Sequence, residues 1–493
     1  MREFTLSSRY LLFPVRTGAP KSRLALWVDG RAVREFDIEL AAAEPEFEVF
    51  LEVLDFAGKR AELRTADGVD SGLAAVRQVD ALPDAAPYGE ALRPQFHFTS
   101  RRGWLNDPNG LVYADGLWHL YYQHNPYGWN WGNMHWGHAV SEDLVCWREL
   151  GIALYPRAYG DWAYSGSGFM LPDGRLGIAY TSTGRGECVA FSDDGGRSFA
   201  EIPENPVVRH RGRDPKVFWY EPGGHWVMAV YDEFEDQRWI VIHTSPDLRT
   251  WTFASRIGGF YECPELFPIR DESGRDRWIL YGADGEYMVG GFDGREFRPE
   301  GGKQRLWFGE FYASQTYTNA PDGRRVQIGW GRGIVFPGMP FNQQMGIACE
   351  LTLVDGTLRA RPVPELARLR GAYRNWRAGE RPAGEIAELV EVTTTLSVPA
   401  GGRGGLTVRG VPVVWDRAAG TLEVADGLFP LALEPAELDL RILVDRGSVE
   451  VFAAAGRLAV AKAVRPDFAN RQLAGVGEAR FGETFAYELG SIW

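Results

Sequence analysis

The sequence is poor in cysteine and has no long hydrophobic run. Its four cysteines are scattered along 493 residues without a Cys-x-x-Cys pair. We predict four free thiols and leave a single disulfide open. No stretch of 18 apolar residues occurs, which argues against a membrane-spanning helix. The first 15 residues lack the charged and apolar regions of a signal peptide, which predicts a cytoplasmic protein, or a secreted one if a leader was removed.

Basic residues are outnumbered by acidic ones. The chain has 53 Lys and Arg against 66 Asp and Glu, a net charge of −13 and a pI near 5.3. This balance argues against a nucleic-acid partner. The length predicts two or three globular domains. The 18 tryptophans do not decide the function, because both carbohydrate sites and all-β cores are rich in aromatic residues.

A repeat with a spacing of about 50 residues occupies the middle of the chain. Its first half is a hairpin pattern, in which two apolar runs flank a glycine turn, and its second half is a Ser-x-Asp turn before an aromatic residue. The hairpin pattern occurs five times, at residues 111–123, 168–181, 217–231, 266–283 and 316–330. This period is typical of four-stranded blades, so the sequence predicts a five-bladed β-propeller over 92–365.

Short alternating strands predict β-rich modules on both sides of the propeller. We predict a small β-sandwich-like module at 1–88, a connector at 366–385 and a C-terminal β-sandwich at 386–493. The predicted fold class is therefore all-β. The N-terminal module has no recognisable catalytic residues. Its role is left open between binding substrate, covering the propeller and forming a homodimer.

Three carboxylates lie at equivalent places in the repeat. Asp107, Asp214 and Glu262 each stand at or just before a proline, ahead of an apolar strand. Any one of them alone is typical of an ordinary turn. If the inner strands of the blades line one axis, all three side chains meet in one funnel. Paired carboxylates are the equipment of glycoside hydrolysis.

The motifs around these carboxylates resemble those of glycoside hydrolase family 32, which includes invertases, levanases and inulinases. They are WLNDPNG at 104–110, YQHNPYG at 122–128, WGNMHWGHA at 131–139, SGS at 165–167, RDP at 213–215, ECP at 262–264, FYASQT at 311–316, MPFNQQM at 339–345 and DRGSVEVF at 445–452. The resemblance covers about 95–493. It implies a five-bladed propeller followed by a sandwich.

The resemblance also implies roles for individual residues. Asp107 matches the nucleophile, Glu262 the general acid/base and Asp214 a carboxylate that stabilises the transition state. The implied substrate-binding residues are Asn106, Gln123, Trp131, Tyr164, Ser165, Arg213, Tyr312 and Trp330. The implied enzyme is a retaining β-fructosidase that releases terminal β-D-fructofuranosyl units from fructans or sucrose, with no cofactor or metal.

Other interpretations stay open at this point. A fructosyltransferase or an endo-acting fructanase would use the same three acids, and the preference among sucrose, inulin and levan is not fixed. A family 43-type arabinanase or xylosidase, or a non-catalytic carbohydrate-binding propeller, fits the motifs less well. The turn at 192–199 resembles the Asp-box of sialidases, and we interpret it as structural. His124, His135 and His138 lack the usual zinc spacing, which favours hydrogen bonding within a blade over a metal site.

Overall fold

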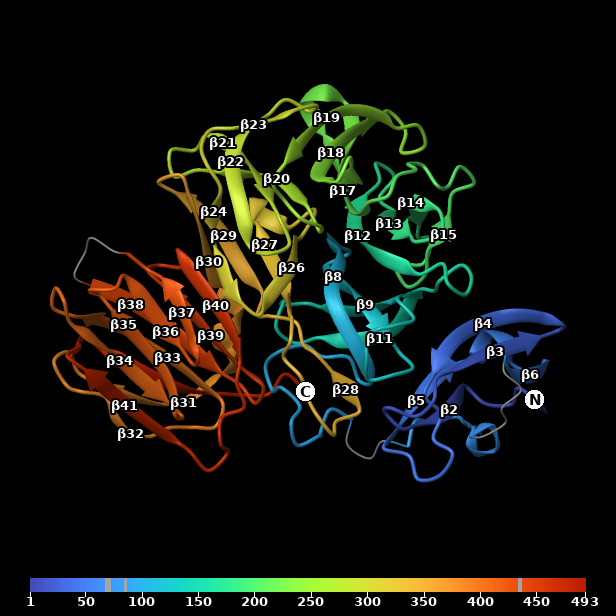
Figure 1. Cartoon of the computed structure of the whole chain (residues 1–493), viewed down its shortest axis with the longest axis horizontal. Coiled ribbons are helices and arrows are strands. Elements are labelled where there is room, and N and C mark those ends of the chain that lie inside the picture. The colour runs from blue at the N-terminus through green and yellow to red at the C-terminus, as the bar shows by residue number, and fades with distance from the viewer. Residues whose placement is uncertain (67–71, 84–86, 433–436) are drawn as a thin grey trace.

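The computed structural model describes residues 1–66, 72–83, 87–432 and 437–493, and strands dominate it (Figure 1). The described helical segments are short 3-10 turns. They are η1 (Leu54–Phe56), η2 (Leu73–Ala75), η3 (Glu221–Gly223), η4 (Pro321–Gly323) and η5 (Pro364–Leu369). No described helix is long and apolar enough to cross a membrane.

Five antiparallel sheets form the predicted propeller. The first two blades are β8 (Gly103–Ala114), β9 (Leu117–Asn125), β10 (His135–Ser141), β11 (Arg148–Leu154), and β12 (Ala163–Met170), β13 (Leu176–Ser182), β14 (Gly186–Phe191), β15 (Ala200–Glu201). The third and fourth are β16 (Arg213–Tyr220), β17 (His225–Phe234), β18 (Gln237–Ser245), β19 (Thr252–Gly258), and β20 (Glu265–Arg270), β21 (Asp276–Tyr281), β22 (Glu286–Phe292), β23 (Phe297–Pro299), with β24 (Gln304–Arg305) beside β22. The fifth is β26 (Phe311–Thr316), β27 (Val326–Gly331), β29 (Cys349–Val354) and β30 (Thr357–Pro362).

All five predicted hairpins are present as antiparallel pairs. The pairs are β8 with β9, β12 with β13, β16 with β17, β20 with β21 and β26 with β27. The ring closes where β28 (Phe341–Asn342) pairs in parallel with β8. A second bridge joins Val112 of the first blade to Thr318 of the fifth. The all-β fold with a five-bladed propeller is thereby confirmed.

The Ser-x-Asp turns connect the third strand of a blade to the fourth. In the second blade the Asp194 carboxylate accepts a hydrogen bond from Ser192 Oγ and others from the backbone N–H groups of Arg197 and Ser198. Asp143 and Asp247 make the same kind of contacts in the first and third blades. A side chain that satisfies successive backbone donors fixes a turn, so the structural interpretation of these motifs is confirmed.

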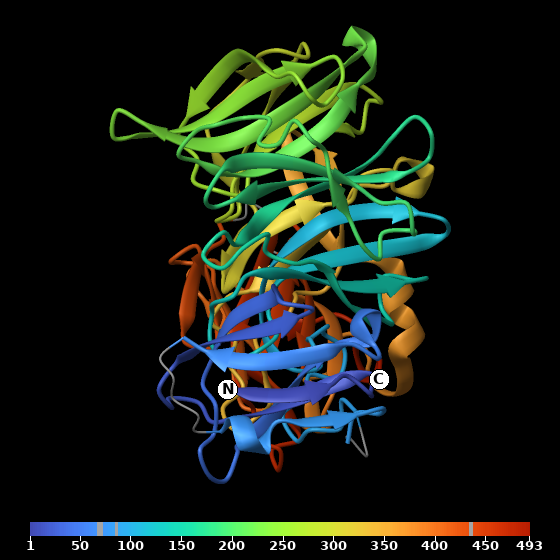
Figure 2. The ribbon, with the colours of Figure 1, turned by 90° about the vertical axis from the view of Figure 1, so that its right-hand side faces the viewer.

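Two β-sandwiches flank the propeller. The N-terminal one packs a sheet in the order β1-β6-β3-β4 against a sheet in the order β5-β2-β7. Its strands are β1 (Arg2–Thr5), β2 (Tyr10–Val15), β3 (Ser22–Val28), β4 (Arg31–Ile38), β5 (Phe47–Glu52), β6 (Arg60–Thr65) and β7 (Arg77–Val79). In the side view of Figure 2 these strands, in dark blue, lie next to the cyan strands of the first blade.

The C-terminal sandwich has one sheet in the order β25-β40-β39-β38-β33-β43-β31, with β42 beside β33, and another in the order β32-β41-β34-β35-β36-β37. Its strands are β25 (Trp307–Gly309), β31 (Arg370–Trp376), β32 (Ala383–Glu385), β33 (Val390–Ser397), β34 (Arg403–Val408), β35 (Val411–Asp416), β36 (Thr421–Val424), β37 (Gly427–Pro430), β38 (Glu437–Val444), β39 (Ser448–Ala453), β40 (Leu458–Ala463), β41 (Gln472–Gly477), β42 (Arg480–Phe481) and β43 (Thr484–Leu489).

The segment 366–385, predicted as a connector, contributes to the sandwich itself. After η5, β31 pairs with β43 and β32 pairs with β41. Most of β31 is exposed, as befits an edge strand, and for that reason its sequence lacks an alternating apolar pattern. We propose that the chain divides into an N-terminal module, a propeller and a C-terminal sandwich, and that residues 366–385 belong to the sandwich. Each sandwich has its own hydrophobic cluster, which supports this division.

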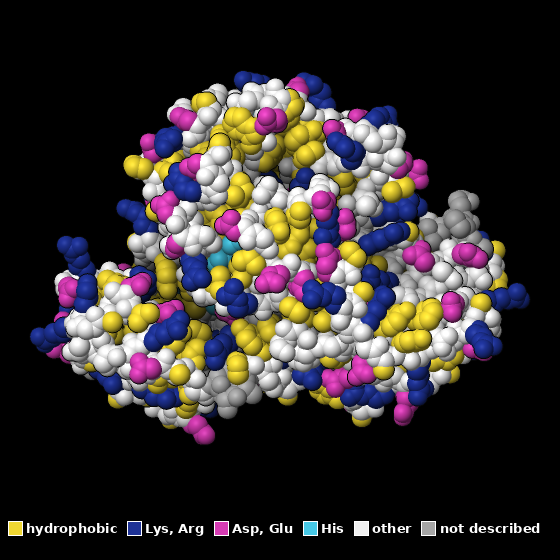
Figure 3. Space-filling model, turned by 180° about the vertical axis from the view of Figure 1, so that it is seen from behind, with side chains coloured by type: hydrophobic (Ala, Val, Ile, Leu, Met, Phe, Trp, Pro, Cys, Tyr) yellow, Lys and Arg dark blue, Asp and Glu magenta, His cyan; other side chains and the backbone are white. Residues whose placement is uncertain are grey.

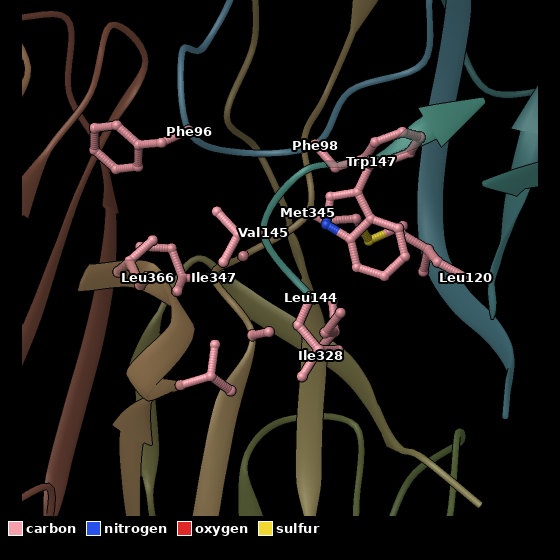
Figure 4. Close-up of a pocket in the computed structure, with 13 residues that line it drawn as sticks. Phe96, Phe98, Leu120, Leu144, Val145, Trp147, Ile328, Met345, Ile347 and Leu366 are labelled. Atoms are coloured by element: carbon pink, nitrogen blue, oxygen red, sulfur yellow. The ribbon is translucent and has the colours of Figure 1, made fainter. Parts of the chain in front are cut away.

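An apolar seam joins the propeller to the C-terminal sandwich. Leu443, Phe452 and Ala461 of the sandwich belong to the main hydrophobic cluster of the propeller. Figure 4 shows a cavity of about 20 Å³ on the propeller side of this cluster, where Phe98, Trp147 and Met345 are among the lining residues. So small an apolar space behaves as core packing rather than as a binding site. Basic and acidic side chains are interspersed over the face shown in Figure 3, which fits a surface without a strong field of one sign.

Candidate active site

The inner strands of four blades carry a bulge at the same end of the propeller axis. The bulges lie between Leu105 and Pro108, between Ala163 and Gly166, between Arg213 and Lys216, and between Tyr312 and Gln315. A bulge adds a residue to one strand and re-aims its side chain. In the fourth blade the chain turns just before β20, where Glu262 and Cys263 have φ values of 33° and 44°. Asp107, Asp214 and Glu262 are all placed by these irregularities.

These irregularities open onto one cavity of about 480 Å³, a size typical of small-molecule sites. All eleven residues predicted as catalytic or substrate-binding line it. They are Asn106, Asp107, Gln123, Trp131, Tyr164, Ser165, Arg213, Asp214, Glu262, Tyr312 and Trp330. The expected convergence of the inner strands therefore brings the whole predicted set together.

Asp107 and Asp214 meet around Cys263. Ser165 Oγ donates to Asp107 Oδ2 over 2.6 Å, and the Cys263 thiol lies 3.8 Å from the same oxygen. Cys263 also donates its backbone N–H to Asp214 Oδ2 over 3.1 Å. Asp214 is 5% exposed and adopts φ 68°, a conformation that costs free energy and clusters at functional sites. The two carboxylates are thus fixed by the surrounding backbone.

Arg213 and Tyr312 hold the third carboxylate. Arg213 donates to Glu262 Oε2 from Nη2 over 2.7 Å and from Nε over 3.0 Å, and Tyr312 OH donates to Oε1 over 2.6 Å. The Arg213 Nε atom is 3.8 Å from Asp214 Oδ2. The guanidinium therefore lies between two acids and pairs mainly with Glu262 rather than with Asp214, its neighbour in the sequence.

The carboxylates shift one another's proton affinity. Burial, followed by the charges of Glu262 and Asp107, raises the pKa of Asp214 to about 8. Burial also raises the pKa of Asp107 to about 6, against the opposing hydrogen bond from Ser165. Like charges close together in a poorly solvated site cannot all ionise at neutral pH. The cluster therefore retains a proton near pH 7.

Aromatic side chains and amides form the rest of the wall. Trp131 is 48% exposed and meets Tyr164 edge to face at 6.2 Å. Trp330 Nε1 donates to Gln343 Oε1 over 3.0 Å, and Trp104 Nε1 donates to Asn106 Oδ1 over 2.9 Å. These bonds fix the Trp330 ring and the Asn106 amide in the cavity wall, where sugar rings and hydroxyl groups would be bound.

Two lining residues, Tyr261 and Arg332, were not predicted. Tyr261 OH accepts a hydrogen bond from Arg213 Nη2 over 3.0 Å. The Arg332 guanidinium lies 4.5 Å from the centre of the Tyr312 ring. Each signal was present in the sequence: Tyr261 immediately precedes Glu262, and Arg332 follows Trp330 by two positions, the spacing of one face of a strand.

The three histidines considered as metal ligands are used inside the first blade. His124 Nδ1 bonds to the Trp104 carbonyl oxygen over 2.6 Å, His135 bonds to that of Asn133, and His138 Nε2 lies 3.0 Å from His119 Nδ1. Burial lowers the pKa of His124 to about 4 and that of His135 to about 3. In the described ranges no three His, Cys, Asp or Glu side chains group as metal ligands would.

Comparison with known proteins identifies the family. The family model described as "Glycosyl hydrolases family 32 N-terminal domain" matches residues 97–362, and the one described as "Glycosyl hydrolases family 32 C terminal" matches residues 387–484. The chain belongs to glycoside hydrolase family 32. Both family 32 models leave residues 1–96 unmatched.

Similar family 32 proteins include a levanase of Bacillus subtilis (strain 168), 32% identical over 83% of this chain and 72% of the relative. An extracellular exo-inulinase of Meyerozyma guilliermondii is 36% identical over 54% of this chain and 60% of that relative. Among solved structures, the exo-inulinase from Aspergillus awamori superposes with a TM-score of 0.73 and 25% identity, over 82% of this chain and 100% of that one.

Proposed function

We propose that this chain is a retaining β-fructosidase that releases terminal β-D-fructofuranosyl units from fructans or sucrose by double displacement. The observation that carries the proposal is the convergence of Asp107, Asp214 and Glu262 on one cavity in a chain of family 32. The levanase, exo-inulinase and invertase relatives support a fructoside as the substrate.

In the first step Asp107 attacks the anomeric carbon of the terminal fructosyl unit. The bond from that carbon to the leaving oxygen breaks, and Glu262 gives the leaving oxygen a proton. A covalent fructosyl ester on Asp107 results. The hydrogen bond from Ser165 to Asp107 holds the attacking carboxylate in a fixed orientation, which lowers the entropic part of the barrier.

In the second step Glu262 takes a proton from water, and the resulting hydroxide attacks the anomeric carbon of the ester. Fructose leaves with its original configuration, and Asp107 is again a free carboxylate. Asp214, which Cys263 and Arg213 hold beside the cavity, stabilises the positive charge that develops on the sugar ring. A buried, preorganised carboxylate acts strongly on such charge.

The proton for the first step comes from the carboxylate cluster. Burial and its acidic neighbours raise the pKa of Asp214 to about 8, so this carboxyl keeps a proton near pH 7. Arg213 lies between Asp214 and Glu262. A proton held within this cluster is the one that Glu262 gives to the leaving oxygen.

Product analysis tests this proposal. Purified protein is incubated with sucrose, inulin and levan, and the released sugars are separated over time. We expect free fructose from the first time points, with the ranking of the three substrates naming the preferred one. Oligosaccharides at early times would indicate endo-cleavage or fructosyl transfer on the same acids. Folded protein that releases nothing from any of the three would contradict the proposal.

A further inference from the structure

One aromatic residue of the cavity wall lies on the rim loop, residues 126–134, which joins β9 to β10. Trp131, at its centre, lines the substrate cavity. On its other side Trp131 also lines a crevice of about 30 Å³, together with Lys21, Asp37 and Glu39 of the N-terminal module. The module, for which the sequence shows no role, therefore lies directly against the pocket rim.

One end of the rim loop is buried in the module. Tyr127 is 1% exposed and belongs to the hydrophobic cluster of the N-terminal sandwich. Its ring stacks on Phe36 of β4, with ring centres 3.6 Å apart and an angle of 15° between the planes. Buried aromatic pairs contribute beyond the area they bury, so this contact ties the start of the loop to the module.

The other end is clamped through a side chain. Asn133 Oδ1 accepts the backbone N–H of Asp37 over 2.8 Å, and Asn133 Nδ2 donates to the Asp37 carbonyl oxygen over 2.7 Å. The Asn133 side chain thus pairs with the backbone at the end of β4. From the end of β9, Asn125 Nδ2 donates to the Asn130 carbonyl oxygen of the loop over 2.7 Å. Trp131 lies between these two anchored points.

We infer that the N-terminal module is a positioning element of the active site, which holds Trp131 in place through Asn133 and Tyr127. The inference rests on the proposed function. A loop held at both ends loses little conformational entropy when a substrate binds, whereas a loosened loop must be ordered at that moment and weakens binding. Loosening the rim loop is therefore expected to raise KM while the chemical step stays intact.

Asn133→Ala in the full-length protein tests this. It removes both hydrogen bonds to Asp37, together with the one that Asn133 Nδ2 donates to Asn125 Oδ1, and leaves the three acids untouched. We expect KM to rise on the order of fivefold to tenfold with kcat changed less than about twofold. In a Trp131→Ala background, Asn133→Ala should raise KM hardly any further, because the side chain that Asn133 positions is gone.

Asn319→Ala is the matched control. Asn319 also has positive φ, 60° against 43° for Asn133, and also donates its amide to a backbone carbonyl, that of Tyr113, but it is exposed and lies outside the rim loop. We expect no change in KM from it. An Asn133→Ala effect that is fully retained in the Trp131→Ala background, or one equal to that of Asn319→Ala, would overturn the inference.

Hydrogen exchange gives a readout that does not depend on turnover. Backbone amides of residues 126–134 should exchange faster in Asn133→Ala than in the unsubstituted protein and in Asn319→Ala. Unchanged exchange would overturn the positioning role even if KM rose. Faster exchange in a protein that hydrolyses no fructoside would instead count against the proposed function and leave the structural role of the module standing.

Discussion

At the scale of single residues, the three carboxylates of the cavity have different environments. Arg213 and Tyr312 occupy both oxygens of Glu262, whereas Asp214 is buried with φ 68° and a pKa raised to about 8. The strain and the proton affinity at Asp214 lower stability. Such costs persist at sites where function needs them.

The first prediction concerns the proton donor. Glu262→Gln removes the acid, so kcat on sucrose should fall by roughly 10²–10⁴-fold. An aryl β-fructofuranoside, whose phenolate leaves without a proton, should lose far less in its first step. Comparing the two substrates by single-turnover kinetics checks this. An equal loss on both would show that Glu262 does not donate the proton.

The pH dependence of kcat/KM follows from the two shifted aspartates. Asp107 must be ionised to attack, so the rate should rise with pH through about 6. The cluster must keep one proton for the leaving group, so the rate should fall as pH passes about 8. A bell-shaped profile in steady-state assays is expected. A rate that still increases above pH 9 would contradict the role of the retained proton.

The roles of the eleven site residues stay predictions, although all eleven line one cavity, as expected from the motifs of the family resemblance. These motifs could not predict that Arg213 pairs mainly with Glu262, because that contact joins two blades and depends on how far the inner strands approach one another. Tyr261 and Arg332 were missed for a similar reason: tyrosine and arginine are common on surfaces, and only the turn before β20 and the end of β27 aim these two inward.

At the scale of elements, neighbouring inner strands share charges beneath the cavity. Lys216 of β16 lies 2.9 Å from Glu265 of β20, and both side chains are buried. Lys216 Nζ also donates to the Thr316 carbonyl oxygen, and Glu265 accepts the backbone N–H of Thr316. Three blades are thus joined by one ion pair across the axis.

Breaking that pair should be costly. Lys216→Met leaves Glu265 charged and buried, so the free energy of unfolding should fall by roughly 3–5 kcal/mol. Adding Glu265→Leu should restore much of it, since neither charge then remains. The exposed pair of Arg270 with Asp276 is the control, and Arg270→Ala should cost less than about 1 kcal/mol. Urea titration measures all three, and equal effects at the two sites would contradict this account.

The hairpins of the blades were readable because each has two apolar runs around a glycine turn. The edge strands β31 and β32 were not predicted, because most of their residues are exposed and polar residues are mixed among them, so that the sequence resembles a connector. The bulges were also hidden. Pairing register depends on the partner strand. The residues around Ala163 and Tyr312 do not by themselves indicate a bulge.

At the scale of the whole molecule, buried charges join the propeller to the C-terminal sandwich. His97 Nδ1 is 2.8 Å from Asp445 Oδ2, and His97 Nε2 is 3.5 Å from Glu450 Oε1. Asp445 also accepts the backbone N–H groups of Gln95 and Phe96. The DRGSVEVF motif at 445–452 thereby acts as a contact between the two domains.

This contact should make stability depend on pH. Although burial opposes the charge, the bonds to Asp445 and Glu450 raise the pKa of His97 to about 9. The stabilisation is complete below the unfolded value of about 6.5 and is lost as pH rises through about 9. His97→Gln should lower the unfolding temperature at pH 6. At pH 9.5 the unfolding temperatures of the variant and the unsubstituted protein should differ less.

Thermal unfolding at the two pH values measures this difference. His225→Gln, in the third blade, is the control. Its difference in unfolding temperature from the unsubstituted protein should be the same at both pH values. A His97→Gln deficit that grows with pH would contradict the assignment of a charged His97. The sequence contained the motif, but it could not reveal the buried pairing, since the partners are about 350 residues apart.

The most direct test of the central claim is the configuration of the first fructose released. Double displacement through Asp107 predicts that proton NMR at early times, before mutarotation, shows β-D-fructofuranose. The initial appearance of the α-anomer would mean a single displacement by water. Such a result would remove Asp107 as the nucleophile and contradict the account of the site given above.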